Sequence, residues 1–171
     1  GPALKEECCC FTGPRPARLP DDGAETSTGI LALKEAVGTA VEQAAGDGYR
    51  YFYTGMAEGF DLFAAEEVLK RRETLGIFLI AAVPYVGFES SSGSAERKQS
   101  ILEQADMVVY VSKTYSEACF RRRNIYMVEH SRRIIGWYNG LSGGTAHCWR
   151  RALAEGLEMV NLYPEPEGET V

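Results

Sequence analysis

Apolar segments of strand length alternate with helical patterns along almost the whole chain. Two of these segments, 77–83 and 107–111, are continuously apolar, which is typical of strands that are covered on both faces. Between the strand-like segments, apolar residues recur at helical spacing, as at Ile30, Leu33 and Val37. The predicted strands are Cys8–Thr12, Tyr49–Thr54, Ile77–Val83, Met107–Val111, Arg133–Tyr138 and Leu157–Leu162.

Five helices are predicted between these strands. The first contains the apolar series from Ile30 to Ala44, and the others are Gly59–Arg72, Ala95–Gln104, Phe120–Ser131 and Thr145–Glu155. Strands that alternate with helices predict an α/β fold with a doubly wound sheet. We therefore expect a three-layer sandwich, in which a mostly parallel sheet of about six strands carries helices on both faces and right-handed crossovers join the strands.

The whole chain, residues 1–171, is predicted to form one domain. Its length is ordinary for a single domain, and no internal repeat or change of composition marks a boundary. We expect the folded core to occupy residues 8–162. The acidic segment 164–171 contains two prolines and is predicted to be a flexible tail.

Charge and hydropathy restrict the classes of partner. The formal net charge is −6, which disfavours general binding to duplex DNA, because that binding depends on lysine and arginine neutralising phosphates. Local charge can still attract a small anionic ligand. No apolar run approaches the ~20 residues that span a bilayer, and no basic segment followed by an apolar leader is seen. We therefore expect a cytoplasmic protein without a membrane partner.

Three consecutive cysteines, Cys8, Cys9 and Cys10, fall in the first predicted strand. Neighbouring side chains of a strand point to opposite faces, so these three thiols cannot gather around one metal. The preferred interpretation is buried thiols in a reduced protein, and a redox or metal role is the alternative. No metal site and no cofactor other than a nucleotide-like ligand are predicted.

Segments that follow the predicted strands are the candidates for a ligand site, because ligands of such sheets bind beyond the carboxyl ends of the strands. The turn Ser142–Thr145 precedes a predicted helix, whose first amides lack partners within the helix and favour an anion. Gly55 and Gly59, on either side of Met56, predict a second cradle of this kind. The alternative for each is an ordinary turn.

Three further side chains at the strand ends have a functional and a structural interpretation. Arg15 lies between two prolines that restrict its backbone; an arginine ~4 Å from a phosphate contributes about 4 kcal/mol at an effective dielectric constant of 20. Asp61 begins a predicted helix, where it would either accept from a ribose hydroxyl or stabilise the helix dipole. Tyr85 would either stack on a base, together with Phe88, or pack in the core.

An ordered set of segments connects the chain to a known family. The segments are "FTGPRPARLP", "GMAEGFDLFAAEEVL", "AAVPY", "ILEQADMVVYVS", "RRRNIYMVEHS" and "YNGLSGGT". Over residues 8 to 162 this set resembles the YpsA-like branch of the SLOG superfamily, which comprises bacterial Rossmann-like proteins. The resemblance implies a Rossmann-like fold, a nucleotide or nucleotide-derived ligand at the glycine-bearing edge, and a sensing or regulatory role.

The wider superfamily includes LOG-type phosphoribohydrolases, which cut the bond between base and ribose phosphate, and DprA-type DNA-binding proteins. The segment 123–127 resembles the LOG-type Arg-Lys-x-x-Met element, with Asn124 in place of lysine. The segment 142–145 resembles a shortened Pro-Gly-Gly-x-Gly-Thr-x-x-Glu element without its glutamate. Glycosidic cleavage uses a carboxylate and a general base, so the resemblance leaves enzymatic activity open, with Arg123, Asp61 and Glu58 as catalytic candidates.

These arguments define a predicted binding site and two alternative functions. The alternatives are a LOG-like nucleotide N-glycosidase and a module that binds single-stranded DNA or a protein, although the acidic charge makes nucleic acid an unexpected partner. A homodimer is expected only by analogy. The predicted ligand-binding residues are Thr12, Gly13, Arg15, Gly55, Met56, Gly59, Asp61, Tyr85, Arg123, Asn124, Gly143, Gly144 and Thr145.

Overall fold

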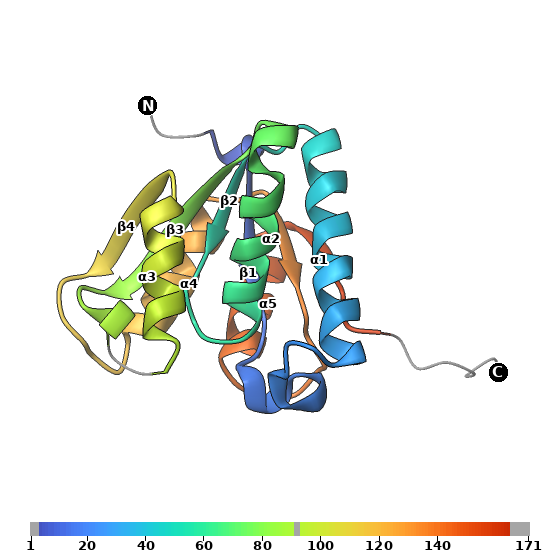
Figure 1. Cartoon of the computed structure of the whole chain (residues 1–171). Helices are drawn as coiled ribbons and strands as arrows, with labels where there is room; N and C mark the ends of the chain where they lie inside the picture. Colours follow the sequence, from blue (N-terminus) through green and yellow to red (C-terminus); the bar gives the residue numbers. More distant parts are fainter. Residues whose placement is uncertain (1–3, 91–92, 165–171) are drawn as a thin grey trace.

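The computed structural model describes residues 4–90 and 93–164. Within them, six strands form one sheet in the order β4-β3-β2-β1-β5-β6, and every neighbouring pair is parallel (Figure 1). The strands are β1 (Cys8–Thr12), β2 (Tyr51–Thr54), β3 (Phe78–Tyr85), β4 (Met107–Ser112), β5 (Arg133–Gly136) and β6 (Glu158–Asn161).

Helices connect successive strands, and the predicted Rossmann-like α/β architecture is confirmed. The predicted tail lies, from residue 165 on, outside the described residues. The α-helices are α1 (Thr28–Gly46), α2 (Phe60–Leu75), α3 (Ala95–Gln104), α4 (Cys119–Glu129) and α5 (Gly144–Ala154), and the short 3₁₀ helices are η1 (Lys5–Glu7), η2 (Pro16–Arg18), η3 (Pro20–Gly23) and η4 (Phe88–Ser90).

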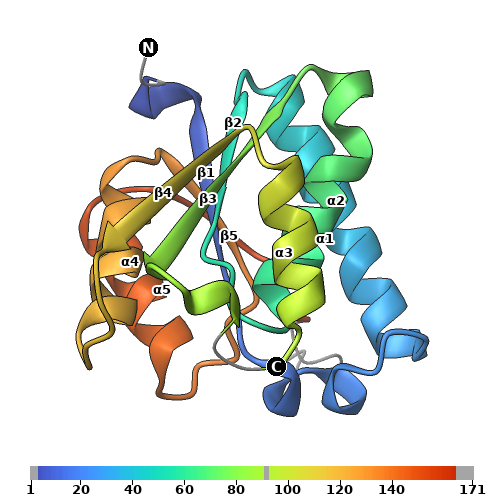
Figure 2. The same ribbon diagram turned by 60° about the vertical axis from the view of Figure 1, so that its left-hand side comes forward.

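Helices lie on both sides of the sheet, as Figure 2 shows, and two clusters of buried apolar residues join them to it. One cluster joins α1, α2 and α3 to the sheet through residues such as Ile30 and Ile101, and the other joins α4 and α5 through Met127 and Ala152. The cysteine triplet follows this division, because Cys9 belongs to the first cluster while its neighbours belong to the second. All three thiols are buried as predicted, and burial raises the pKa of Cys8 to about 11.

The predicted end of the third strand at Val83 is wrong, because β3 continues through Pro84 to Tyr85. The last residue of β2, Thr54, is paired with Ala81, so β3 extends beyond β2 and pairs there with β4 alone. Near the end of a strand with one open side, proline's missing N–H group removes no required ladder bond. The strand therefore tolerates Pro84.

The order of the strands reverses at β1. From β1 the chain builds β2, β3 and β4 on one side, and it then returns to place β5 against the other side of β1. The crossover connections therefore diverge to opposite faces, and a crevice opens beyond the carboxyl ends of β1 and β5. Among the helices of the described ranges, none is both long enough and apolar enough to cross a bilayer.

Candidate functional site

A cavity of about 510 Å³ lies at this reversal point. Its wall comes from the segment after β1, the first half of α4 and the segment between β5 and α5, with a contribution from α2. Nine of the thirteen predicted binding residues line it, together with eleven residues that are discussed below. The nine are Thr12, Gly13, Arg15, Asp61, Arg123, Asn124, Gly143, Gly144 and Thr145.

The beginning of α5 forms one side of the cavity. Gly143 precedes the helix with φ +133°, a conformation that L side chains rarely adopt, and Gly144 has open space around its Cα. No side chain caps α5. The Nη1 group of Arg18 donates to the carbonyl oxygen of Ser142 at 2.7 Å, which fastens the glycine turn to the segment after β1. The first-turn amides are thereby available to an anion.

Two guanidinium groups make cation–π contacts with the ring of Phe120. The Cζ atoms of Arg15 and Arg123 lie 5.7 and 5.8 Å from its centroid. Arg123 is buried, and it donates through Nη1 to the Gly55 carbonyl at 2.5 Å and through Nε to the Asn124 side chain at 2.9 Å. Arg15 is exposed, and within the described parts of the chain its side chain makes no hydrogen bond or ion pair.

Asp61 supplies a buried carboxyl to the same cavity. Its Oδ2 atom accepts a hydrogen bond from the Ala57 amide at 3.2 Å. Burial raises the pKa of Asp61 to about 6, although Arg123, the Ala57 amide and Arg15 oppose this change. Burial also lowers the pKa of Arg123 from its ordinary value, and the charge of Asp61 opposes that change. The cavity therefore contains a carboxyl that titrates near neutral pH beside two cationic groups.

The raised pKa of Asp61 predicts a specific pH dependence of stability. The folded protein binds this proton more tightly than the unfolded chain, so the group's contribution to stability falls as pH rises from about 4 to about 6. At pH 7.5 we expect Asp61→Asn to raise the free energy of unfolding by about 1–3 kcal/mol. Urea unfolding at pH 4.5 and 7.5 measures this, with Glu96→Gln, an exposed position, as control. A variant less stable than wild type at both pH values would contradict the assignment.

Three predicted residues of the second glycine segment lie behind the cavity wall instead of lining it. The carbonyl of Gly55 holds Arg123, and a Cβ atom there would lie 2.9 Å from the Asp61 carboxylate. Met56 is 1% exposed and belongs to the core. Gly59 has φ +87°, and a Cβ there would lie 2.8 Å from the Pro14 carbonyl oxygen. These residues position the wall, and ligand contact at them stays a prediction.

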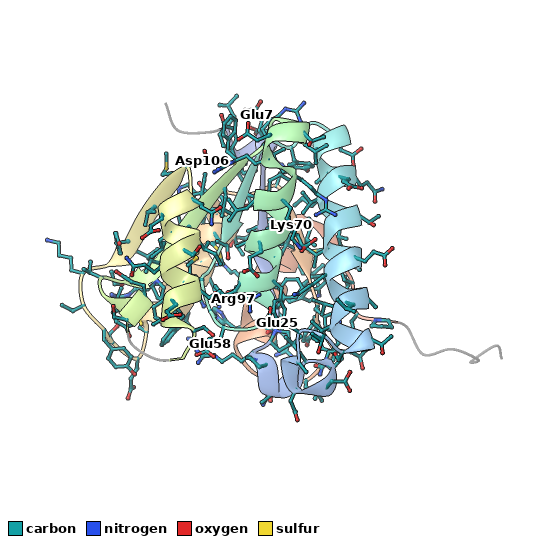
Figure 3. The ribbon with its side chains drawn as sticks, in the orientation of Figure 1. Glu7, Glu25, Glu58, Lys70, Arg97 and Asp106 are labelled. Carbon is teal, nitrogen blue, oxygen red and sulfur yellow. The ribbon has the colours of Figure 1, made fainter. Side chains whose placement is uncertain are left out.

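Tyr85 and Glu58 also lie outside the lining. The ring of Tyr85 packs edge-on against Phe88, Tyr115 and Phe120, with centroids 5.6, 5.5 and 6.5 Å away. Figure 3 shows Glu58 at the end of the sheet opposite to Glu7, which precedes β1, and hence near the carboxyl ends of the strands. A Cβ atom at Gly93 would lie 3.1 Å from the Glu58 carboxylate, so this side chain faces the segment before α3.

Other residues of the lining were absent from the predicted set. Their signal was present in the sequence, because they stand in or next to segments that the prediction had singled out, such as "FTGPRPARLP" and "YNGLSGGT". Trp137 is 8% exposed and packs edge-on against Tyr163 with a centroid distance of 4.6 Å. The missed residues are Phe11, Pro14, Ala17, Arg18, Ala57, Phe120, Met127, Trp137, Asn139, Leu141 and Ser142.

Together these features define a Rossmann-like α/β protein with an open, cation-lined cavity at the reversal point of its parallel sheet. The family model of YpsA, described as the YspA SLOG family, matches residues 9–159. The chain therefore belongs to the YpsA family of the SLOG group, as the sequence predicted.

Relatives and solved structures agree with this membership. The chain is 28% identical over 156 residues to the uncharacterized SPbeta prophage-derived protein YoqJ of Bacillus subtilis, covering 80% of this chain and 90% of YoqJ. DNA processing protein A from Streptococcus pneumoniae has a similar structure, with a TM-score of 0.65 at 16% identity over 97% of this chain and 53% of that one. The Helicobacter pylori protein of that name, solved to explain single-stranded DNA binding, gives a TM-score of 0.64 at 19% identity over 97% and 68%.

Proposed function

We propose that the cavity binds a nucleotide or nucleotide-derived ligand and that this binding serves a sensing or regulatory role. The observation that carries the proposal is the meeting of an unpaired guanidinium, Arg15, with the uncapped beginning of α5 in one cavity. Its volume of about 510 Å³ lies in the range of small-molecule sites, roughly 300–1,000 Å³.

Each part of a nucleotide has a complementary part of the wall. The amides after Gly143 and the guanidinium of Arg15 suit a phosphate, since backbone donors and arginine both form charge-assisted hydrogen bonds to phosphate oxygens. Asp61 suits a ribose hydroxyl, because a carboxylate accepts from it. The rings of Phe120 and Trp137 supply apolar surface for a base.

A thermal-shift screen of nucleotides, ADP-ribose and nucleotide sugars tests the proposal. A ligand at a hundredfold excess over its dissociation constant adds about 2.7 kcal/mol, which corresponds to a rise in melting temperature of roughly 5–10 °C for a chain of this size. Arg15→Gln is expected to weaken the binding about 10-fold and to change the melting temperature of the free protein little, because within the described ranges the exposed Arg15 side chain loses only its contact with the Phe120 ring and no hydrogen bond or ion pair. A screen without any shift would contradict the proposal.

A second candidate is a nucleotide N-glycosidase, and the carboxyl of Asp61 favours it. A general base works best with a pKa near the operating pH, and the pKa of Asp61 is about 6 within the cavity. Hydrolysis would add water across the bond between base and ribose, releasing free base and a ribose phosphate. Incubation with nucleoside 5′-monophosphates, followed by chromatography of free bases, detects this reaction, and Asp61→Asn should abolish it. Absence of base across the panel would exclude it.

The structural likeness to DNA processing protein A raises single-stranded DNA as a further ligand. This likeness concerns the fold, because the identities are 16% and 19%. The net charge of −6 disfavours nucleic acid. Titration with an oligothymidylate at two salt concentrations separates the cases, since binding to DNA neutralises many phosphates and should weaken steeply with salt, whereas binding of a ligand with one or two phosphates should weaken less.

A further inference from the structure

A second hollow, of about 410 Å³, lies between α4 and α5 and shares Gly143 with the first cavity. Four residues of α5 line it: Ala146, His147, Arg150 and Arg151. His147 lies three and four positions before the two arginines, so these three side chains share one face of the helix. Arg121 lines the hollow from α4, and the two hollows meet at Gly143, at the beginning of α5.

Of the three arginines that line this hollow, only Arg151 forms ion pairs with carboxylates among the described residues. Arg151 has two carboxylate partners, Glu155 on its own helix and Glu129 at 3.6 Å. In the described ranges, Arg121 and Arg150 have no ion pair and no hydrogen bond from their side chains. Like charges held side by side without a counter-charge repel each other, and an anion placed between them would remove the repulsion.

His147 gives an independent indication of a missing partner. Its Nδ1 atom is buried and makes no hydrogen bond, although a buried polar atom normally has one. Burial lowers the pKa of His147, and the charges of Arg121 and Arg151 lower it further. The hollow is thus short of negative charge and of hydrogen-bonding partners at the same place.

We infer that Arg121 and Arg150 form a second phosphate-binding subsite for the same ligand. This inference rests on the proposed function, and it makes the ligand a nucleotide with two or more phosphates, such as a nucleoside diphosphate or a diphosphate-linked dinucleotide. One phosphate lies at the beginning of α5, and the next crosses Gly143 to reach the two arginines. A Cβ atom at residue 143 would lie 3.1 Å from Nη1 of Arg18, whereas at Gly144 a Cβ atom would meet none of the described residues within 4 Å, so the open space at this turn lies beside Gly144.

Calorimetric titrations of the adenosine, guanosine, cytidine and uridine series, each as mono-, di- and triphosphate, test the subsite at fixed ionic strength. In the wild-type protein we expect the diphosphate to bind about 10-fold or more tightly than the monophosphate with the same base. In Arg121→Gln/Arg150→Gln this preference should fall to about 2-fold, since the two exposed arginines together contribute about 5-fold. Affinity for the monophosphate should change little.

Arg122→Gln is the matched control. Arg122 is the neighbour of Arg121 on α4, is exposed, and lines neither hollow. Its replacement therefore removes one positive charge from the same helix without changing the subsite. Melting temperatures of all variants should match the wild type, because the replaced side chains are exposed. The preference for the diphosphate should persist in this control.

The possible results separate the two proposals. If the monophosphate binds and the diphosphate preference is unchanged in the double variant, the second subsite is wrong and the nucleotide cavity stands. If no nucleotide in the four series binds to the wild-type protein and neither ADP-ribose nor a nucleotide sugar shifts its melting temperature, both proposals are wrong. If only an oligothymidylate binds, with a steep salt dependence that the double variant reduces, the arginines contact nucleic acid and the subsite is again wrong.

Discussion

Replacing Arg123 by glutamine is expected to abolish nucleotide binding and to lower the free energy of unfolding by about 2–4 kcal/mol. The guanidinium is buried, holds the Gly55 carbonyl at 2.5 Å, and balances the carboxyl of Asp61. Its loss leaves a buried carbonyl without its donor and a buried carboxyl without its strongest counter-charge. Because Arg123 is the first group opposing the upward pKa change of Asp61, the pKa of that carboxyl should rise further above 6.

Urea unfolding measures the stability, and titration of a nucleotide below the melting temperature of the variant measures the binding. Arg123→Lys should restore little of either, because an ammonium group cannot reproduce the planar set of donors that bonds Gly55 and Asn124 together. Arg122→Gln, the exposed neighbour, should stay within about 0.5 kcal/mol of the wild type. A stable Arg123→Gln protein that still binds nucleotide would refute the role of this residue.

Gly13→Ala is expected to destabilise the protein by about 3 kcal/mol, or to prevent folding. A Cβ atom at residue 13 would lie 2.2 Å from Cγ and 2.5 Å from Cβ of Phe60, which is fully buried and packs edge-on against Phe11 at 6.5 Å. The Cβ atom of Phe60 is fixed to its backbone, so rotation of this buried side chain does not relieve the contact. Gly13 therefore lets the segment after β1 contact the first residue of α2, and this contact shapes the cavity.

A double-mutant cycle with Phe60→Ala tests that explanation. This change removes Cγ and Cδ1, two of the three atoms nearest to the added Cβ, so the cost of Gly13→Ala should fall by about 1 kcal/mol or more, on the order of a direct-contact coupling. Gly46→Ala is the control: a Cβ atom there meets nothing within 4 Å, and it should be neutral or stabilising by up to about 1 kcal/mol. If Gly13→Ala lowers the free energy of unfolding equally in both backgrounds, the destabilisation does not come from the contact with Phe60.

Local pattern was sufficient to predict the elements and the fold class. The run Ile77–Val83 is continuously apolar, and its residues 78–83 lie inside the sheet in β3, between β2 and β4. The equally apolar run 107–111 was wrongly expected to be covered on both faces, because it forms the edge strand β4, where Met107 and Tyr110 are 48% and 45% exposed. The alternation within the cysteine triplet correctly placed Cys9 opposite to its neighbours. Such properties depend on residues within one or two turns of each other, and each segment expresses them independently of the others.

Convergence of the site segments was also predictable in outline. In a parallel sheet the segments after the strands meet at one edge, so Arg15, Asp61, Arg123 and the turn before α5 were expected together, and the structure brings them to one cavity. The boundaries were less predictable, as Pro84 shows, because a strand's end depends on how far its neighbours extend.

Only the tertiary structure shows what each of several similar residues contacts. The family resemblance had singled out Arg123, and the packing of α4 on the sheet buries it in the cavity. The same packing turns Arg121 toward α5 and leaves Arg122 exposed, which the sequence did not predict. The same holds for Phe120, which lines the cavity where Tyr85 was expected. Such differences arise from contacts between segments far apart in the chain, whose rotation about each helix is set by the whole core and by no local pattern.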